Sequence, residues 1–167
     1  KSSIPGFLED YAFTIEAFIE LYQVSAELEW LSCAKELCED AAIKFQHSES
    51  KMCYFSAEDD TLITRKMEIH DNVIPSTNAV MAMNFFKLGT YFKLEEWIST
   101  SQQMVANIYD GMEQYGSGYS HWANVLLLQL SGINEVHVNE SELTREEIAS
   151  NCSWRELIAY HRTIPMS

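Results

Sequence analysis

The amino-acid sequence matches itself at an offset of 67 residues, and this internal repeat constrains the fold more than any other feature. The identical positions are Ala12 and Ala79, Phe18 and Phe85, Leu21 and Leu88, Glu29-Trp30 and Glu96-Trp97, and Ser32 and Ser99. Each copy holds two stretches whose apolar residues recur at helical spacing, which predicts a pair of amphipathic helices. A helical hairpin of this kind cannot bury both of its faces alone, so copies of it stack on one another. The repeat therefore predicts a mainly α fold of stacked helical hairpins.

Five helices are expected in the first four fifths of the chain. They cover about 7–24, 27–46, 76–89, 94–109 and 118–131. Ser76 follows a proline and is a good N-cap residue for the third of these helices. The third, fourth and fifth helices are expected to end at Gly89, at Asp110-Gly111 and at Gly132, because glycine readily adopts the backbone conformation that closes a helix.

The remaining segments carry shorter signals. Residues 52–55 and 61–64 are predicted to be two short strands, and 135–138 alternates as a third. The tetrapeptides that begin at Thr144 and at Ser153 both fit the capping box, which predicts two short helices near the end of the chain, or one helix broken near Asn151. We therefore divide the chain into a helical-hairpin segment, 1–132, and a small α/β tail, 133–167.

The acidic composition narrows the classes of partner. Among 167 residues, 25 Asp and Glu stand against 11 Lys and Arg, giving a formal net charge of -14. Nucleic acids and anionic membranes require clustered Lys and Arg, and none cluster in this sequence, so we exclude both as partners. A neutral sugar is compatible with the charge, and so is an acidic surface that only aids solubility.

The sequence carries no signature of a metal, a cofactor or export. Cys33, Cys38, Cys53 and Cys152 lack zinc-type spacing, and no glycine-rich phosphate loop is present. We therefore expect neither metal nor cofactor. No apolar run reaches membrane-spanning length and no signal peptide is visible, so we expect a cytoplasmic protein with reduced thiols. Because the chain begins with a lysine, we also expect it to be a fragment of a longer protein.

Three stretches in combination resemble one protein family. The sequence GFLEDYAF at 6–13 resembles the family's helix start, 52–60 resembles its hairpin, and 66–78 resembles its K-x-x-x-D-G-A-x-P-S-x-N segment, with Asp-Asn-Val in place of D-G-A. The family is that of spermatogenesis-associated protein 20 and its bacterial relatives. The resemblance implies the later part of a long protein, after a thioredoxin-like domain that is absent here. It implies an incomplete (α/α)6 toroid, similar to the barrels of N-acylglucosamine 2-epimerases and six-hairpin glycosidases.

His70 and Asp71 are the candidate catalytic residues. Sugar epimerases of this fold class use histidine as acid and base to move a proton beside a carbonyl carbon, and histidine titrates near neutral pH. The structural alternative is that His70 pins the loop and Asp71 stabilises a turn.

Four further residues are candidates for substrate binding, namely Asp10, Tyr11, Ser76 and Asn78. The repeat superimposes 9–11 on 76–78, so both polar triplets are expected on one rim of the ring. Asp10, with Glu9 and Asp71, could supply the carboxylate pair of a glycosidase, although acids in a first helical turn also favour the helix dipole. The first interpretation of Ser76 is a helix cap and that of Asn78 is a polar position in the first helical turn, and an aromatic at helical spacing such as Tyr11 is more often a core residue.

Two functions remain open at this stage. The first is a carbohydrate-active or carbohydrate-binding domain, resembling an epimerase or a glycoside hydrolase, with its site on the rim. The second is a non-catalytic scaffold or binding domain that accompanies a thioredoxin-like module. In both cases we expect the chain to pack against missing hairpins of the barrel or against a second chain, because part of a ring leaves apolar edges open.

Overall fold

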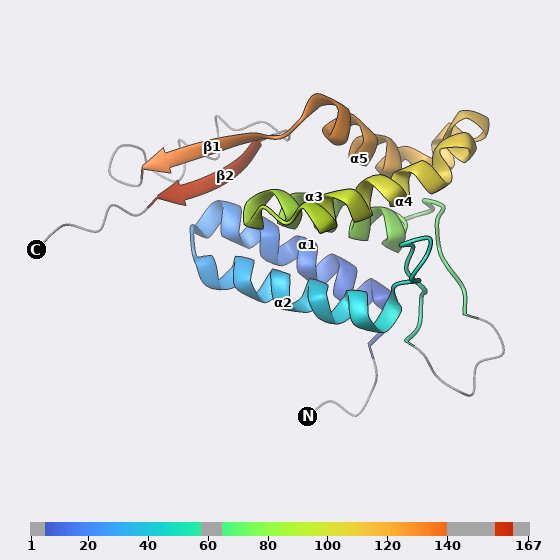
Figure 1. The fold of residues 1–167 in the computed structure, drawn as a ribbon, viewed down its shortest axis with the longest axis horizontal. Coiled ribbons are helices and arrows are strands. Elements are labelled where there is room, and N and C mark those ends of the chain that lie inside the picture. The colour runs from blue at the N-terminus through green and yellow to red at the C-terminus, as the bar shows by residue number, and fades with distance from the viewer. Residues whose placement is uncertain (1–5, 58–64, 140–155, 162–167) are drawn as a thin grey trace, which may run out of the picture.

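The computed structural model describes residues 6–57, 65–139 and 156–161, and within these ranges the fold is mainly helical (Figure 1). The elements in chain order are α1 (Leu8–Ser25), α2 (Leu28–Phe45), α3 (Thr77–Phe92), α4 (Glu95–Gln114), the 3-10 turn η1 (Gly116–Tyr119), α5 (Ser120–Ser131), β1 (Asn134–Asn139) and β2 (Glu156–His161). The predicted mainly α fold of helical hairpins is confirmed. The boundary between a helical-hairpin segment and a tail at residue 132 stays a prediction.

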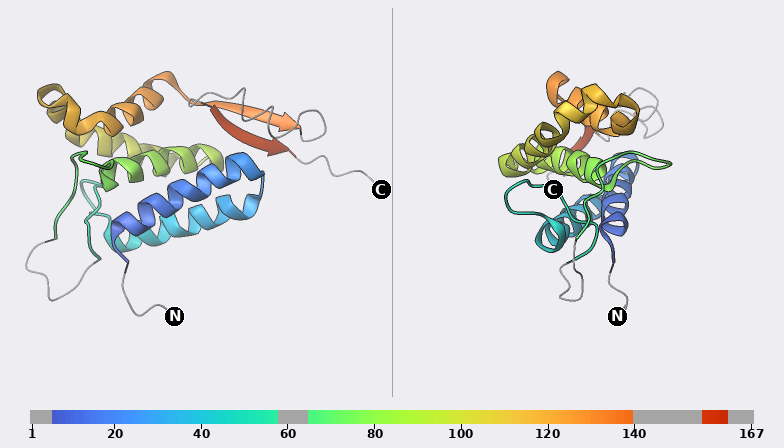
Figure 2. Two further views of the ribbon diagram at one scale, coloured as in Figure 1. Left: turned by 180° about the vertical axis from the view of Figure 1, so that it is seen from behind. Right: turned by 90° about the vertical axis from the view of Figure 1, so that its right-hand side faces the viewer.

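The two hairpins follow the internal repeat closely. The offset of 67 carries the end of α1, Ser25, onto the end of α3, Phe92, and the start of α2, Leu28, onto the start of α4, Glu95. Helices α1 and α2 pack on each other, as do α3 and α4, and α1 also packs on α3. Helix α5 adds to α3 on the far side from α1, so that α1, α3 and α5 lie together while α2 and α4 form the other layer (Figure 2).

Helix α3 is the centre of the core. Its residues from Thr77 to Phe86 are all at least nine-tenths buried, because α1, α4 and α5 surround it. The largest fully buried side chains of the core include Phe85 of α3 itself, Phe45 of α2 and Trp122 of α5. Burial of apolar surface at about 25 cal/mol per Å² is the main force that holds such a stack together.

Two predicted helix ends are wrong. Helix α3 continues past Gly89 to Phe92, and α4 continues past Gly111 to Gln114. Both glycines serve close packing instead, since a Cβ atom at Gly89 would lie 2.8 Å from Cγ1 of Ile98 on α4. The predicted end at Gly132 is confirmed by its positive φ of 71° directly after α5.

The strand predictions have mixed outcomes. Strand β1 contains the predicted 135–138 and pairs in parallel with β2, with Val136 opposite Ile158. The helix predicted from the capping box at 153–156 is wrong, because residues 156–161 form β2, where an apolar run supports strand pairing. The strand predicted at 52–55 is reduced to one isolated bridge between Gln46 and Cys53. The strand predicted at 61–64 and the helix predicted at 144 lie outside the described residues.

None of the helices in the described ranges combines the length and the apolar character needed to cross a lipid bilayer.

Candidate functional site

A cleft of about 500 Å³ lies at the N-terminal end of α1 and α3. It is lined by Glu9 of α1, by most of the loop 66–77, and by Tyr115 after α4. The two polar stretches GFLEDY and HDNVIPSTN therefore border one cleft, as the repeat predicts. Its volume lies within the range of small-molecule sites, roughly 300–1,000 Å³. We call it the rim cleft.

His70 presents an exposed imidazole to the rim cleft. Its Nε2 atom lies 3.0 Å from the hydroxyl of Tyr119, and the two rings lie 4.9 Å apart. Tyr119 is buried and fits against Gly111, where a Cβ atom would lie 2.7 Å from the tyrosine hydroxyl. A buried partner thus orients His70, the histidine that lines the cleft among the described residues.

Asp71 braces the starts of two helices. Its Oδ1 accepts a hydrogen bond from the main-chain N–H of Ser76 at 2.8 Å, and its Oδ2 accepts from the N–H of His121 at 2.7 Å. Its own N–H donates to the carbonyl of Gly118 at 2.8 Å. A carboxylate is favoured at helix N-termini because the unpaired N–H groups and the helix dipole attract negative charge. No hydrogen bond joins Asp71 to His70 within the described part of the chain, so the expected catalytic pair is not linked directly.

Ser76 and Asn78 are held by internal hydrogen bonds. The hydroxyl of Ser76 accepts from the N–H of Ala79 at 3.2 Å, which makes it the N-cap of α3. The side chain of Asn78 is fully buried; it accepts from the N–H of Cys53 at 2.7 Å and donates to the carbonyls of Cys53 and Glu68 at 2.9 Å each. Ser76 lines the rim cleft, whereas Asn78 does not; its side chain joins the segment around Cys53 to Glu68 in the wall of the cleft.

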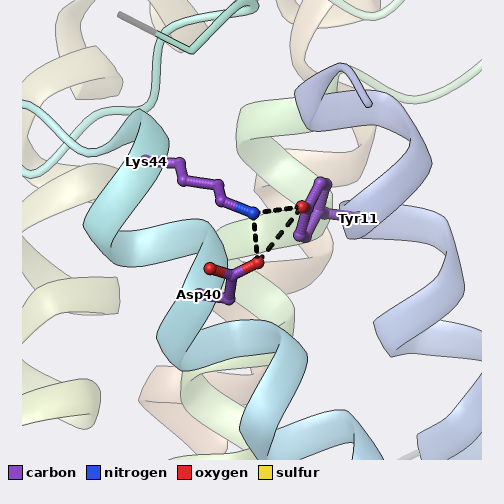
Figure 3. Close-up of polar contacts among 3 residues, drawn as sticks. All are labelled: Tyr11, Asp40 and Lys44. Atoms are coloured by element: carbon purple, nitrogen blue, oxygen red, sulfur yellow. Dashed lines mark hydrogen bonds and ion pairs between the residues drawn. The ribbon is translucent and has the colours of Figure 1, made fainter. Parts of the chain in front are cut away.

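Asp10 and Tyr11 do not line the rim cleft. The carboxylate of Asp10 accepts from the N–H of Phe7 at 2.8 Å at the start of α1. The hydroxyl of Tyr11 donates to Asp40 at 3.1 Å and accepts from Lys44 at 2.7 Å, between α1 and α2 (Figure 3). The hydrogen bond from Lys44 holds the pKa of Asp40 below its usual value, and the same bond raises the pKa of Lys44.

Three charged residues that were not among the predicted binding residues also line the rim cleft: Glu9, which was considered only as a partner of Asp10, and Lys66 and Glu68, which were not considered. Glu9 lines it in place of its neighbour Asp10, because adjacent residues on a helix point about 100° apart and only one can face the cleft. Lys66 and Glu68 line it too, and their side chains form an ion pair at 3.0 Å. The sequence feature that could have indicated these two residues is the resemblance to the family motif at 66–78, in which Lys66 is the first matched position.

No family model matches this chain. Spermatogenesis-associated protein 20 of Mus musculus is 33% identical over 96 residues, and so is that of Homo sapiens. Each match covers 56% of this chain and 12% of the relative, so the matched region spans only a small part of these long proteins. An uncharacterised protein of Caenorhabditis elegans is 29% identical over 105 residues, which is 62% of this chain and 14% of that protein. Over more than half of its length, the chain therefore shows the partial resemblance to the spermatogenesis-associated protein 20 family that its motifs predict.

Proposed function

We propose that the chain forms part of a carbohydrate-binding site, and that the rim cleft is that site. One observation carries the proposal, namely that a single cleft brings together Glu9 from the start of α1 and His70 from the loop before α3. Carboxylate and imidazole groups are suited to the hydroxyl groups of a sugar, since each hydroxyl both donates and accepts a hydrogen bond. The net charge of -14 favours a neutral ligand over an anionic one.

The chemistry that we propose for this site is proton transfer by His70 beside a carbonyl carbon, as in a sugar epimerase or isomerase. The hydrogen bond to Tyr119 at 3.0 Å fixes the direction of the imidazole, which is what a general acid or base requires. Glycoside hydrolysis is the other form of the proposal. The carboxylates that line the cleft and do not brace helices, Glu9 and Glu68, are then the candidates for the required pair.

Titration of the ¹⁵N-labelled chain with neutral monosaccharides tests the proposal. Binding at about millimolar Kd should shift amide resonances of Glu9 and of 66–77. The substitutions Glu9→Gln and His70→Ala should weaken it, whereas Glu29→Gln, at an exposed position on α2, should not. Sugar-dependent shifts confined to residues outside the rim cleft would refute the proposal.

A second candidate is a non-catalytic scaffold that accompanies a thioredoxin-like module. The observation that favours it is the saturation of Asp71 and Asn78 by internal hydrogen bonds, which explains both residues without a ligand. A rim cleft that no sugar occupies, together with direct binding of the thioredoxin-like domain of a full-length relative, would support this alternative.

We also propose that further hairpins or a second chain cover the exposed side of α5. Leu127 and Leu130 lie three residues apart on this helix and are 40% and 77% exposed. A stable monomer in sedimentation, with no association at high concentration, would contradict the proposal.

We also propose a cytoplasmic location for the protein. Cys33, Cys38 and Cys53 are free thiols, as in proteins of reducing compartments.

A further inference from the structure

A second cleft, of about 300 Å³, lies along α3 between α1 and α5. It is lined by Glu16 of α1, Met83 and Lys87 of α3, and His121, Asn124 and Leu128 of α5. None of these residues lines the rim cleft. We call it the α5 cleft.

The imidazole of His121 has hydrogen-bonding capacity that the protein leaves unused. The main-chain N–H of His121 donates to Asp71, but the side-chain Nε2 is buried and has no hydrogen-bond partner within the described ranges. Burial lowers the pKa of His121 and Lys87 acts in the same direction, while Glu16 and Asp71 oppose the shift. The ring is therefore neutral near pH 7, with one nitrogen that donates and one that accepts.

Glu16 supplies the carboxylate of the α5 cleft. It is half-buried and interacts electrostatically with His121, and its side chain forms no hydrogen bond or ion pair within the described ranges. Lys87 is already engaged: its side chain is 15% exposed and its ammonium pairs with Glu20 at 2.7 Å. Buried polar atoms normally have partners, so the unpaired Nε2 of His121, in a cleft that also holds the carboxylate of Glu16, points to a ligand.

The composition of the α5 cleft selects the class of that ligand. Glu16 repels an anion, and the ammonium of Lys87 repels a cation even though Glu20 partly neutralises it, so a neutral molecule avoids both penalties. Hydroxyl groups satisfy acceptors and donors alike, and this cleft offers both. Met83 and Leu128 add an apolar wall, which suits the C–H face of a sugar ring or polyol.

We propose that the α5 cleft binds a small neutral polyhydroxylated ligand, a monosaccharide or a polyol, through the side chains of His121 and Glu16. A volume of about 300 Å³ admits a molecule of this size. Nε2 is buried in this structure, and the proposal therefore includes a two-fold turn of the ring on binding, which the broad terminal torsion of histidine allows. This site is separate from the rim cleft and does not depend on the function proposed for it.

The imidazole nitrogen resonances of His121 provide the test. The full 167-residue chain, labelled with ¹⁵N, is titrated with D-glucose and with myo-inositol up to about 50 mM, a range that detects millimolar binding. Either probe should shift the Nε2 resonance of His121 together with the amides of 121–128. No shift at His121 in the folded protein with either probe would overturn the proposal, whatever happens at the rim cleft.

Matched substitutions separate the two clefts. Glu16→Gln and His121→Gln should each weaken binding at the α5 cleft about tenfold, as expected for the loss of one strong hydrogen bond. Because His121→Gln keeps the main-chain N–H, the bond to Asp71 is retained. Glu9→Gln, in the rim cleft, should leave the affinity of the α5 cleft unchanged. An equal loss in all three variants would overturn the assignment, and glucose 6-phosphate binding more tightly than glucose would overturn the ligand class.

Discussion

Replacing Asn78 by alanine is expected to destabilise the fold by about 3–5 kcal/mol. Asn78 is fully buried, and its side-chain amide makes three hydrogen bonds. Two of them go to the N–H and the carbonyl of Cys53, and the third goes to the carbonyl of Glu68. The substitution leaves all three main-chain groups without these partners, at about 1–2 kcal/mol for each group that stays dry.

Asn84 provides a matched control for this loss. It is also fully buried on α3, but its amide makes one hydrogen bond within the described ranges, a donation to the carbonyl of Ala12 at 2.8 Å. Ala12 lies inside α1, so its carbonyl keeps its helical hydrogen bond when Asn84 is removed. The Oδ1 atom of Asn84 has no partner among the described residues. Asn84→Ala should therefore cost about 1–2 kcal/mol while removing the same number of atoms.

Urea unfolding followed by far-UV circular dichroism measures both free energies of unfolding. Asn78→Asp controls for the loss of side-chain volume, because aspartate has nearly the same shape as asparagine. It places a carboxylate oxygen, which cannot donate, against the carbonyls of Cys53 and Glu68. It should be at least as damaging at pH 7 as Asn78→Ala. Losses at Asn78 and Asn84 that agree within about 0.5 kcal/mol would refute the reasoning, since the extra hydrogen bonds would then contribute nothing measurable.

Three further predictions concern Asp71, His121 and the thiols. Asp71→Asn replaces one carboxylate oxygen by an NH₂ group, which then faces the main-chain N–H of Ser76 or of His121. The substitution should lower the free energy of unfolding, measured in urea, by about 1.5–3 kcal/mol. An unchanged unfolding midpoint would contradict the stabilising role of Asp71. Burial lowers the pKa of His121 in the folded state, so as the pH falls His121 is protonated in the unfolded chain at a higher pH than in the folded chain. Stability should therefore fall as the pH drops below about 6.5 toward the folded pKa, and thermal melts of His121→Gln should show a flatter pH dependence than the native chain. Burial raises the pKa of Cys53 to about 12, so iodoacetamide should label the partly exposed Cys33 well before Cys53 in native protein, as read by peptide mass spectrometry; labelling at equal rates would contradict the burial.

The hairpins could be predicted from the sequence because their signals are local and repeated. Apolar periodicity places α1 and α2 within one residue of their observed ends, and the repeat transfers the same pattern to α3 and α4. The errors arise where a local signal competes with a contact that sequence does not show. Gly89 resembles a helix end, but its missing Cβ makes room for Ile98 of α4. The capping box at 153–156 is a local helix signal, and parallel pairing of β2 with β1 prevails over it.

The rim could be predicted as a location, whereas the roles of its residues could not. The repeat aligned the starts of α1 and α3, and a cleft with Glu9 and His70 lies there. Sequence shows that a residue is polar, but not how many hydrogen bonds the fold supplies to it. Asp10 and Tyr11 were expected at the cleft and instead bond to Phe7 and to the Asp40–Lys44 pair.

The more informative quantity is the hydrogen-bonding capacity that remains after folding. A buried polar group needs a partner, and when the fold supplies all of them the residue is explained by stability alone. Asn78 meets that condition. His121 does not, because its Nε2 is buried without a partner among the described residues. In sequence, His121 is one polar residue at the start of an apolar helix and carries no motif, so only the folded environment distinguishes it. A ligand gains the most by bonding to a buried group, such as Nε2 of His121, that the fold leaves without a partner. The α5 cleft is therefore the more informative place to test for ligand binding.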